Sequence, residues 1–176
     1  MGVAYLLLGS NLGNKEDNLG KAVKLLRKIG KIKKQSALYE TEPWGFSDRE
    51  NFFNQAICLE TFLSPPELLA ELLKIETSIG RKRHAKQWVA REIDIDIIFY
   101  DNLVLSGEFL TIPHPLLKKR KFVLTPLKEI APSFIHPIFG KNITDLLKEC
   151  SDNCKVEILR PPLICQVLLQ IKRELI

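Results

Sequence analysis

Two aspartates near the middle of the chain have the spacing of a metal site. Asp94 and Asp96 alternate with isoleucines in the run from Ile93 to Tyr100. Successive side chains of a strand point to opposite faces, so both carboxylates share one face and the isoleucines share the other. Two carboxylates about 6–7 Å apart at Cα repel each other unless a cation lies between them. Mg²⁺ binds through one or two carboxylates together with substrate phosphates, and we expect it here.

A basic segment leads directly into this aspartate pair. It contains five cationic residues, namely Arg81, Lys82, Arg83, Lys86 and Arg91. A run of charge by itself is typical of a solvated surface. Next to two carboxylates that can bind metal, it favours a clamp for polyphosphate, because Mg²⁺ and guanidinium groups hold phosphate oxygens together. The sequence therefore predicts nucleotide chemistry, with residues 81–91 as a loop that closes over the nucleotide.

A second group of residues has the chemistry to hold a flat acceptor molecule. Thr41, Phe52 and Asn54 flank a segment rich in loop-forming residues, and Phe122 follows later in the chain. Aromatic rings stack on heterocycles and an asparagine amide pairs with their polar edge, although a phenylalanine is more often simply part of the core. His114 lies between two prolines, where we expect it to be exposed, either as a contact to phosphate or base or as an ordinary surface residue.

The elements that must position these groups follow from apolar periodicity and from helix capping signals. We expect strands at residues 3–8, 32–41, 53–62 and 93–100, and a helix from about Lys15 to Ile29. A second helix begins at Ser64, where Ser64 and Glu67 have capping-box spacing, and stops at Gly80. The order β-α-β-β-α-β indicates an α+β, ferredoxin-like fold. Its antiparallel sheet carries both helices on one face and leaves the other free for a site. A further helical segment covers residues 120–130.

Length and composition set the outer limits. The chain has 176 residues and a formal net charge of +5. We expect one main domain at residues 1–150 and a C-terminal extension of unknown role at 151–176, which could mediate association of an otherwise monomeric protein. The charge suggests anionic partners. The longest apolar runs fall short of the roughly 20 residues that span a bilayer, and we expect a cytoplasmic protein with reduced, structural cysteines.

The ordered motifs resemble those of the 6-hydroxymethyl-7,8-dihydropterin pyrophosphokinase family. The resemblance runs from Ala4 to about Leu147. It depends on Tyr5-x-x-x-Gly9-Ser10-Asn11-Leu12-Gly13, Tyr39-x-Thr41-x-Pro43, Phe53-Asn54-x-Ala56, Glu76-x-x-x-Gly80-Arg81, Trp88-x-x-Arg91-x-Ile93-Asp94-Ile95-Asp96, Ile112-Pro113-His114-Pro115, Arg120-x-Phe122 and Pro126-Leu127. It implies a ferredoxin-like enzyme that transfers diphosphate from ATP to the hydroxymethyl group of the pterin and releases AMP.

The resemblance also implies roles for individual residues. Asp94 and Asp96 would hold two Mg²⁺ ions, and Arg81 and Arg91 would be catalytic by neutralising charge on the transferred group. The residues implied to meet ATP are Glu76, Arg83, Trp88, Ile97, His114 and Arg120. Those implied to hold the pterin are Thr41, Glu42, Pro43, Trp44, Phe52, Asn54 and Phe122, with Phe52 and Phe122 stacking on its two faces.

The chain departs from the family pattern at three places. Val89-Ala90 stands before Arg91 where Gly-Pro is frequent, and Phe52 stands where a tyrosine is common. Pro115 follows His114 where relatives often have another residue. The first change affects the flexibility of the loop, the second removes a hydroxyl but keeps a stacking ring, and the third affects a contact on the adenosine side.

Two other classes of function fit part of the pattern. A nucleotidyl-transferring palm domain also places two carboxylates on a ferredoxin-like sheet and uses two metals. A ferredoxin-like RNA-binding module would need stacking aromatics on its central strands, and it leaves the aspartate pair unexplained. The sequence lacks a stripe of basic and aromatic residues along one face, so we expect no nucleic-acid partner. From the short apolar runs we also expect no membrane partner.

Overall fold

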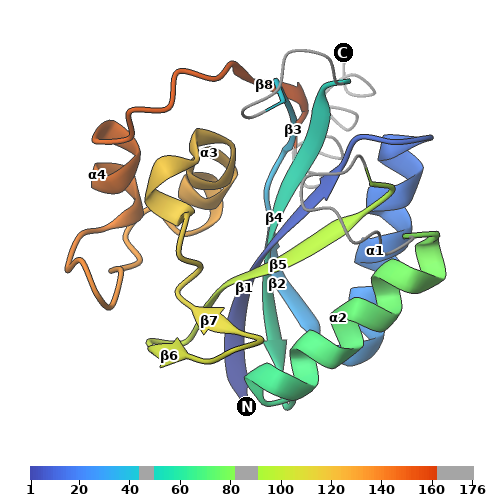
Figure 1. Ribbon diagram of the computed structural model, residues 1–176, viewed down its shortest axis with the longest axis horizontal. Coiled ribbons are helices and arrows are strands. Elements are labelled where there is room, and N and C mark those ends of the chain that lie inside the picture. The colour runs from blue at the N-terminus through green and yellow to red at the C-terminus, as the bar shows by residue number, and fades with distance from the viewer. Residues whose placement is uncertain (44–49, 82–90, 162–176) are drawn as a thin grey trace, which may run out of the picture.

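A six-stranded antiparallel sheet forms the centre of the computed structural model, which describes residues 1–43, 50–81 and 91–161 (Figure 1). The sheet order is β5-β1-β4-β3-β8, and β2 also pairs with β4. The strands are β1 (Gly2–Ser10), β2 (Lys31–Gln35), β3 (Leu38–Thr41), β4 (Phe52–Thr61), β5 (Asp94–Tyr100) and β8 (Val156–Arg160). A separate two-stranded ribbon joins β6 (Leu105–Ser106) to β7 (Thr111–Ile112). The ferredoxin-like α+β prediction is confirmed.

The two predicted helices begin and end where their capping residues require. α1 (Lys15–Ile29) starts after Asn14, whose Oδ1 accepts the N–H of Asp17 at 3.1 Å. α2 (Pro65–Ile79) has the predicted capping box, in which the N–H of Ser64 donates to Glu67 at 2.8 Å. It stops at Gly80, whose φ of 119° is in the left-handed region that favours glycine.

The strand predicted at residues 32–41 is divided in two. β2 and β3 both pair with β4, and Ser36 and Ala37 separate them. The Ser36 side chain explains the break, because its hydroxyl donates to the Ala37 carbonyl at 2.8 Å and accepts the N–H of Ala56 at 2.9 Å. A serine that satisfies backbone groups locally interrupts a regular ladder.

Both faces of the sheet are covered by helices, which corrects the expectation of a free second face (Figure 1). α1 and α2 lie on one face over a core that includes Leu6, Leu8 and Ile57. On the other face lie the short helix η1 (Leu117–Lys119), α3 (Lys121–Ile130) and α4 (Ile143–Lys148). The reason is that the strands also carry apolar side chains on this second face, and these pack against apolar residues of α3 and α4. The strand residues involved are Leu7, Ala56, Cys58 and Ile98.

The described part of the C-terminal extension adds one strand to this sheet. β8 pairs antiparallel with β3, and the sequence analysis does not predict it. The main chain of Glu42 donates to the Lys155 carbonyl at 3.3 Å, and the Glu42 carboxylate accepts the N–H of Lys155 at 3.1 Å. Cys58, Cys150 and Cys154 are free thiols, and Cys165 lies outside the described residues. Among the described residues, no helix is long and apolar enough to cross a membrane.

Candidate active site

The sheet register places the predicted metal and acceptor residues on one face. Asp94 on β5 is opposite Gly9 on β1, Gly9 is opposite Asn54 on β4, and Asn54 is opposite Tyr39 on β3. Directly opposed residues of an antiparallel pair point to the same face. Asp96, two residues along β5, shares this face because of the strand period. The face is the one that α3 covers, so a helix lies across from the row.

Glycine at position 9 keeps the middle of this row open. A Cβ atom there would lie 3.1 Å from the Asn54 Oδ1 atom, which is tighter than ordinary contact. The Asn54 amide is already oriented, since its Nδ2 donates to the Thr41 hydroxyl at 2.7 Å. Thr41 is in turn opposite Phe52. Between Asp94 and Asn54 the row therefore has a floor of backbone, against which a flat molecule can lie close to the sheet.

Asp94 is held by two arginines from the ends of the basic segment. The Arg81 Nη1 atom lies 2.7 Å from its Oδ1, and the Arg91 Nη1 atom lies 2.5 Å from its Oδ2. The Asp94 side chain still has 25% of its surface exposed, so it stays accessible from solvent. Three charged groups thus meet at the edge strand β5, and both cations that compensate Asp94 are also able to bind phosphate.

Asp96 is the less compensated of the two carboxylates. Burial and the neighbouring Asp94 carboxylate raise its pKa well above the ordinary range, and the Arg120 guanidinium opposes this shift. A carboxylate whose charged form is disfavoured in this way gains most from a cation placed beside it. The described residues contain no group of three or more acidic, histidine or cysteine side chains suited to a metal. Carboxylate oxygens are ligands that Mg²⁺ prefers, and Mg²⁺ commonly takes its other ligands from water and substrate phosphates.

Glu76 connects the end of α2 to the carboxylate strand. It is 2% exposed, its Oε1 accepts the N–H of Ile95 at 2.7 Å, and its Oε2 pairs with the Arg81 guanidinium. Burial raises the pKa of Glu76, and the Asp94 charge adds to the shift. Arg81 lies between Glu76 and Asp94, so its position is fixed by two carboxylates from two elements.

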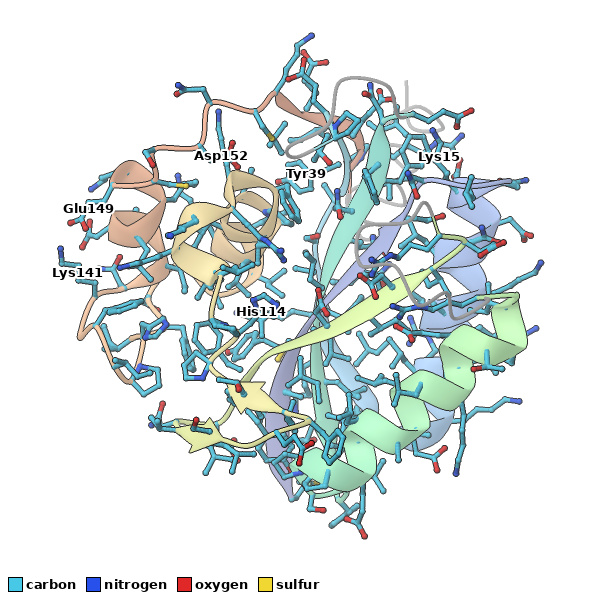
Figure 2. All side chains as sticks on the ribbon, in the orientation of Figure 1. Lys15, Tyr39, His114, Lys141, Glu149 and Asp152 are labelled. Carbon is cyan, nitrogen blue, oxygen red and sulfur yellow. The ribbon has the colours of Figure 1, made fainter. Side chains whose placement is uncertain are left out.

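His114 and Arg120 face the aspartates from the other side of the site. Figure 2 shows His114 between α3 and β5. The expectation that His114 is exposed is wrong, because it is half-buried and its main-chain N–H donates to the Ile98 carbonyl at 3.0 Å. Burial and the Arg120 charge lower its pKa to about 4. Its Nδ1 accepts the N–H of Leu116 at 3.3 Å, so the neutral ring carries its proton on Nε2.

The remaining predicted residues differ in how they relate to this row. Phe122 is half-buried at the start of α3, and the Arg120 guanidinium carbon lies 5.6 Å from its ring centroid. Ile97 points its side chain into the core under α1 and α2, so only its main chain, on the outermost strand of the sheet, is available to a ligand. Pro43 is half-buried, and Glu42 contacts the start of β8. Trp44, Arg83 and Trp88 lie outside the described residues.

Three residues that shape the site were not predicted as site residues from the sequence. Gly9 and Asn11 appear only in the first motif of the family resemblance, and Asn18 only within the helix predicted from Lys15 to Ile29. Gly9 forms the floor described above, and Asn11 and Asn18 are buried polar residues bonded to the main chain of residues 91 and 92. The signal that was available is the pair of asparagines around a glycine-containing turn, since buried polar side chains require partners.

Comparison with known proteins gives one consistent family. The model of the 7,8-dihydro-6-hydroxymethylpterin-pyrophosphokinase family matches residues 5–132. The chain is 42% identical, over 85% of its length and 92% of the relative, to 2-amino-4-hydroxy-6-hydroxymethyldihydropteridine pyrophosphokinase of Aquifex aeolicus strain VF5. It is 41% identical to the protein of the same name from Bacillus subtilis strain 168, over 73% of this chain and 77% of that one.

The fold has solved counterparts as well. The structure superposes on Plasmodium falciparum HPPK-DHPS in a crystal structure with SDX-DHP, with a TM-score of 0.66 and 18% sequence identity. The match covers 85% of this chain and 43% of that one, so the chain spans less than half of the solved protein. At this identity the likeness bears on the fold alone.

Proposed function

The chain belongs to the 7,8-dihydro-6-hydroxymethylpterin-pyrophosphokinase family, and we propose that the row from Asp94 to Asn54 is the active site of this activity. The enzyme transfers a diphosphate group from ATP to the hydroxymethyl group of 6-hydroxymethyl-7,8-dihydropterin, in folate biosynthesis, and AMP is released. One observation carries the assignment of the site. The sheet register brings the two carboxylates and the Asn54 amide to the same face, with Gly9 between Asp94 and Asn54.

The nucleotide end of the site is the aspartate pair, with Asp94 and Asp96 as catalytic residues and metal ligands. We propose that they hold two Mg²⁺ ions, which would supply positive charge to neutralise the phosphates of ATP. The repulsion that raises the pKa of Asp96 supports this, since a cation would remove it. ATP itself brings the phosphate oxygens that the protein does not supply.

The arginines form the second part of the catalytic machinery. Arg81 and Arg91 meet at Asp94 from the two ends of the basic segment, and Arg120 acts on Asp96 from the start of α3. Positioning and charge neutralisation provide most of the catalysis in phosphoryl-type transfer. These residues therefore need only hold their positive charge close to the diphosphate group while it is transferred. His114, neutral and with its proton on Nε2, is suited to donate to ATP.

The acceptor end holds the pterin. Asn54 and Thr41 present an oriented amide and hydroxyl to its polar edge, and Phe52 and Phe122 are the stacking rings. With its ring in this position, the hydroxymethyl group can point along the row toward the aspartates, where it meets the diphosphate. The further contacts implied by the resemblance complete the proposal, namely Glu42, Pro43 and Trp44 to the pterin, and Glu76, Arg83, Trp88 and the Ile97 main chain to ATP. A monomeric state, a cytoplasmic location and a division near residue 150 stay predictions.

A product assay tests the activity. The purified protein is incubated with ATP, Mg²⁺ and 6-hydroxymethyl-7,8-dihydropterin, and nucleotides and pterins are quantified by chromatography. AMP and pterin diphosphate should appear in equal amounts, and neither should form when the pterin or the divalent ion is left out. Release of ADP in place of AMP, or AMP formation without the pterin, would contradict the proposal.

A further inference from the structure

We propose that Asn11 and Asn18 are positioning residues for Arg91, which they hold against Asp94 by its main chain. The inference deepens the proposed function, because it rests on the role that this function gives to the Arg91 guanidinium. Each asparagine bonds to the main chain just before β5 begins.

Asn11 fixes both main-chain polar groups of Arg91. It is only 1% exposed. Its Oδ1 accepts the N–H of Arg91 at 2.8 Å, and its own N–H donates to the Arg91 carbonyl at 3.1 Å. Two bonds in opposite directions define where the Arg91 backbone lies and how it is turned. The guanidinium of the same residue then reaches Asp94, three residues further on, at 2.5 Å.

Asn18 fixes the next peptide unit. It is 8% exposed in the first turns of α1, and its Nδ2 donates to the Glu92 carbonyl and to the Leu12 carbonyl, both at 3.0 Å. An amide nitrogen has two hydrogens, so both are used. The bonds join α1, the turn after β1 and the entry to β5 at one atom. Residues 91 and 92 are therefore held by two different asparagines from two different elements.

The two clamps use opposite ends of the asparagine amide. Asn11 must accept, because its partner is a backbone N–H, and Asn18 must donate, because its partners are backbone carbonyls. An aspartate has almost the same shape but can only accept when ionised. The same substitution should thus be tolerated at position 11 and harmful at position 18. Displacing a reacting group by about 1 Å can slow a reaction about a hundredfold. We therefore expect a displaced Arg91 to lower kcat and to leave KM nearly unchanged.

The first experiment compares Asn11→Asp with Asn18→Asp in the AMP release assay. Asn11→Asp should keep kcat within about threefold, because the acceptor atom remains. Asn18→Asp should lower kcat by about tenfold or more, with KM for ATP and pterin within about twofold, because the binding residues are untouched. Asn142→Ala, which removes the N-cap of α4, is the control for a lost asparagine bond and should leave kcat unchanged. Equal kcat in the two aspartate variants would overturn the inference.

A double-mutant cycle tests whether the effect passes through Arg91, and it remains available if Asn18→Asp does not fold. Asn11→Ala should lower kcat about tenfold in the wild-type background and less than about twofold in Arg91→Ala, because the positioned group is then gone. Additive losses would assign Asn11 a merely structural role and overturn this inference alone. A wild-type protein without pterin-dependent AMP release would overturn the proposed function and this inference together. Arg91→Ala at full kcat would remove Arg91 from the catalytic residues and overturn this inference, while the activity itself would stand.

Discussion

The two faces of the central strands use alternate residues of the same backbone for opposite purposes. Toward α1 and α2, the strands present a continuous set of buried aliphatic side chains. Toward α3, the same strands present an acidic side chain on β5 beside smaller or apolar residues on β1 and β4, in two successive rows. The first set includes Leu6, Leu8, Ile57, Leu59, Ile95 and Ile97, and the second includes Leu7, Gly9, Asn54, Ala56, Asp94 and Asp96.

This difference shows how the fold can tolerate an electrostatically unfavourable site on one face. Each buried aliphatic side chain of the α1 and α2 face stabilises the fold by about 1.5–3 kcal/mol. On the opposite face, burial and the Asp94 charge raise the pKa of Asp96, so the ionised form of Asp96 destabilises the folded state. Because the strand period is two residues, a change on one face leaves the other face nearly untouched. We therefore expect substitutions to separate into those that affect rate and those that affect stability.

The largest effect should come from Asp96→Asn. Loss of this carboxylate should lower kcat by about a thousandfold or more, because a metal-binding and charge-positioning group is removed. The free energy of unfolding at pH 7 should stay the same or increase, since the repulsion with Asp94 disappears. Kinetics and urea denaturation on the same preparation measure both. Substantial turnover in this variant would remove Asp96 from the catalytic machinery.

Leu72→Ala should have the opposite profile. Leu72 is completely buried on α2, and its truncation should lower the free energy of unfolding by about 3 kcal/mol, through lost burial and a cavity. At a temperature well below the new melting point, kcat should remain within about twofold of wild type. A fall in kcat comparable to that of Asp96→Asn would show that the two faces are coupled.

Gly9→Ala should give a smaller effect on the site face. The new methyl group would lie between Asp94 and Asn54, 3.1 Å from the Asn54 Oδ1. We expect this methyl group to obstruct the pterin, so that kcat/KM for the pterin falls about tenfold. That factor corresponds to a loss of about 1.4 kcal/mol in transition-state stabilisation. The matched control is Gly20→Ala in α1, where a Cβ meets nothing within 4 Å. It should raise stability slightly and leave the kinetics unchanged. Equal kinetics in both variants would show that position 9 is not the floor of the site.

The smallest expected effect is a pH dependence of the free energy of unfolding, through His114. The pKa of His114 is about 4 in the folded chain, below its ordinary value of 6.5. Between these values the unfolded chain takes up the proton first, so the free energy of unfolding should fall as the pH falls, by about 1 kcal/mol between pH 7 and 5.5. His114→Gln should remove this part of the pH dependence, and the comparison cancels the contribution of other groups. Urea denaturation at several pH values measures it, and parallel curves for the two proteins would contradict the burial of His114.

Local patterns explain which parts of the fold could be predicted. The helix bounds at Lys15, Ile29 and Gly80 follow from periodicity and capping, which involve residues within a few positions of each other. The break at Ser36 was missed because a hydroxyl that bonds to Ala56 acts across twenty positions. β8 was missed for the same reason, since its exposed, mixed sequence becomes a strand only beside β3. Likewise, the cover of α3 over the second face depends on apolar residues from several strands.

The sequence by itself determined that Asp94 and Asp96 share a face, and its ordered motifs identified the family. Both follow from residue order alone, through the strand period and the motif spacing. Only the tertiary structure decided what surrounds these carboxylates. Gly9 lies between Asp94 and Asn54 because of strand register, and Arg91 reaches Asp94 from a main chain held by Asn11, eighty positions away. Register and packing join residues that are distant in sequence, so no local pattern contains them.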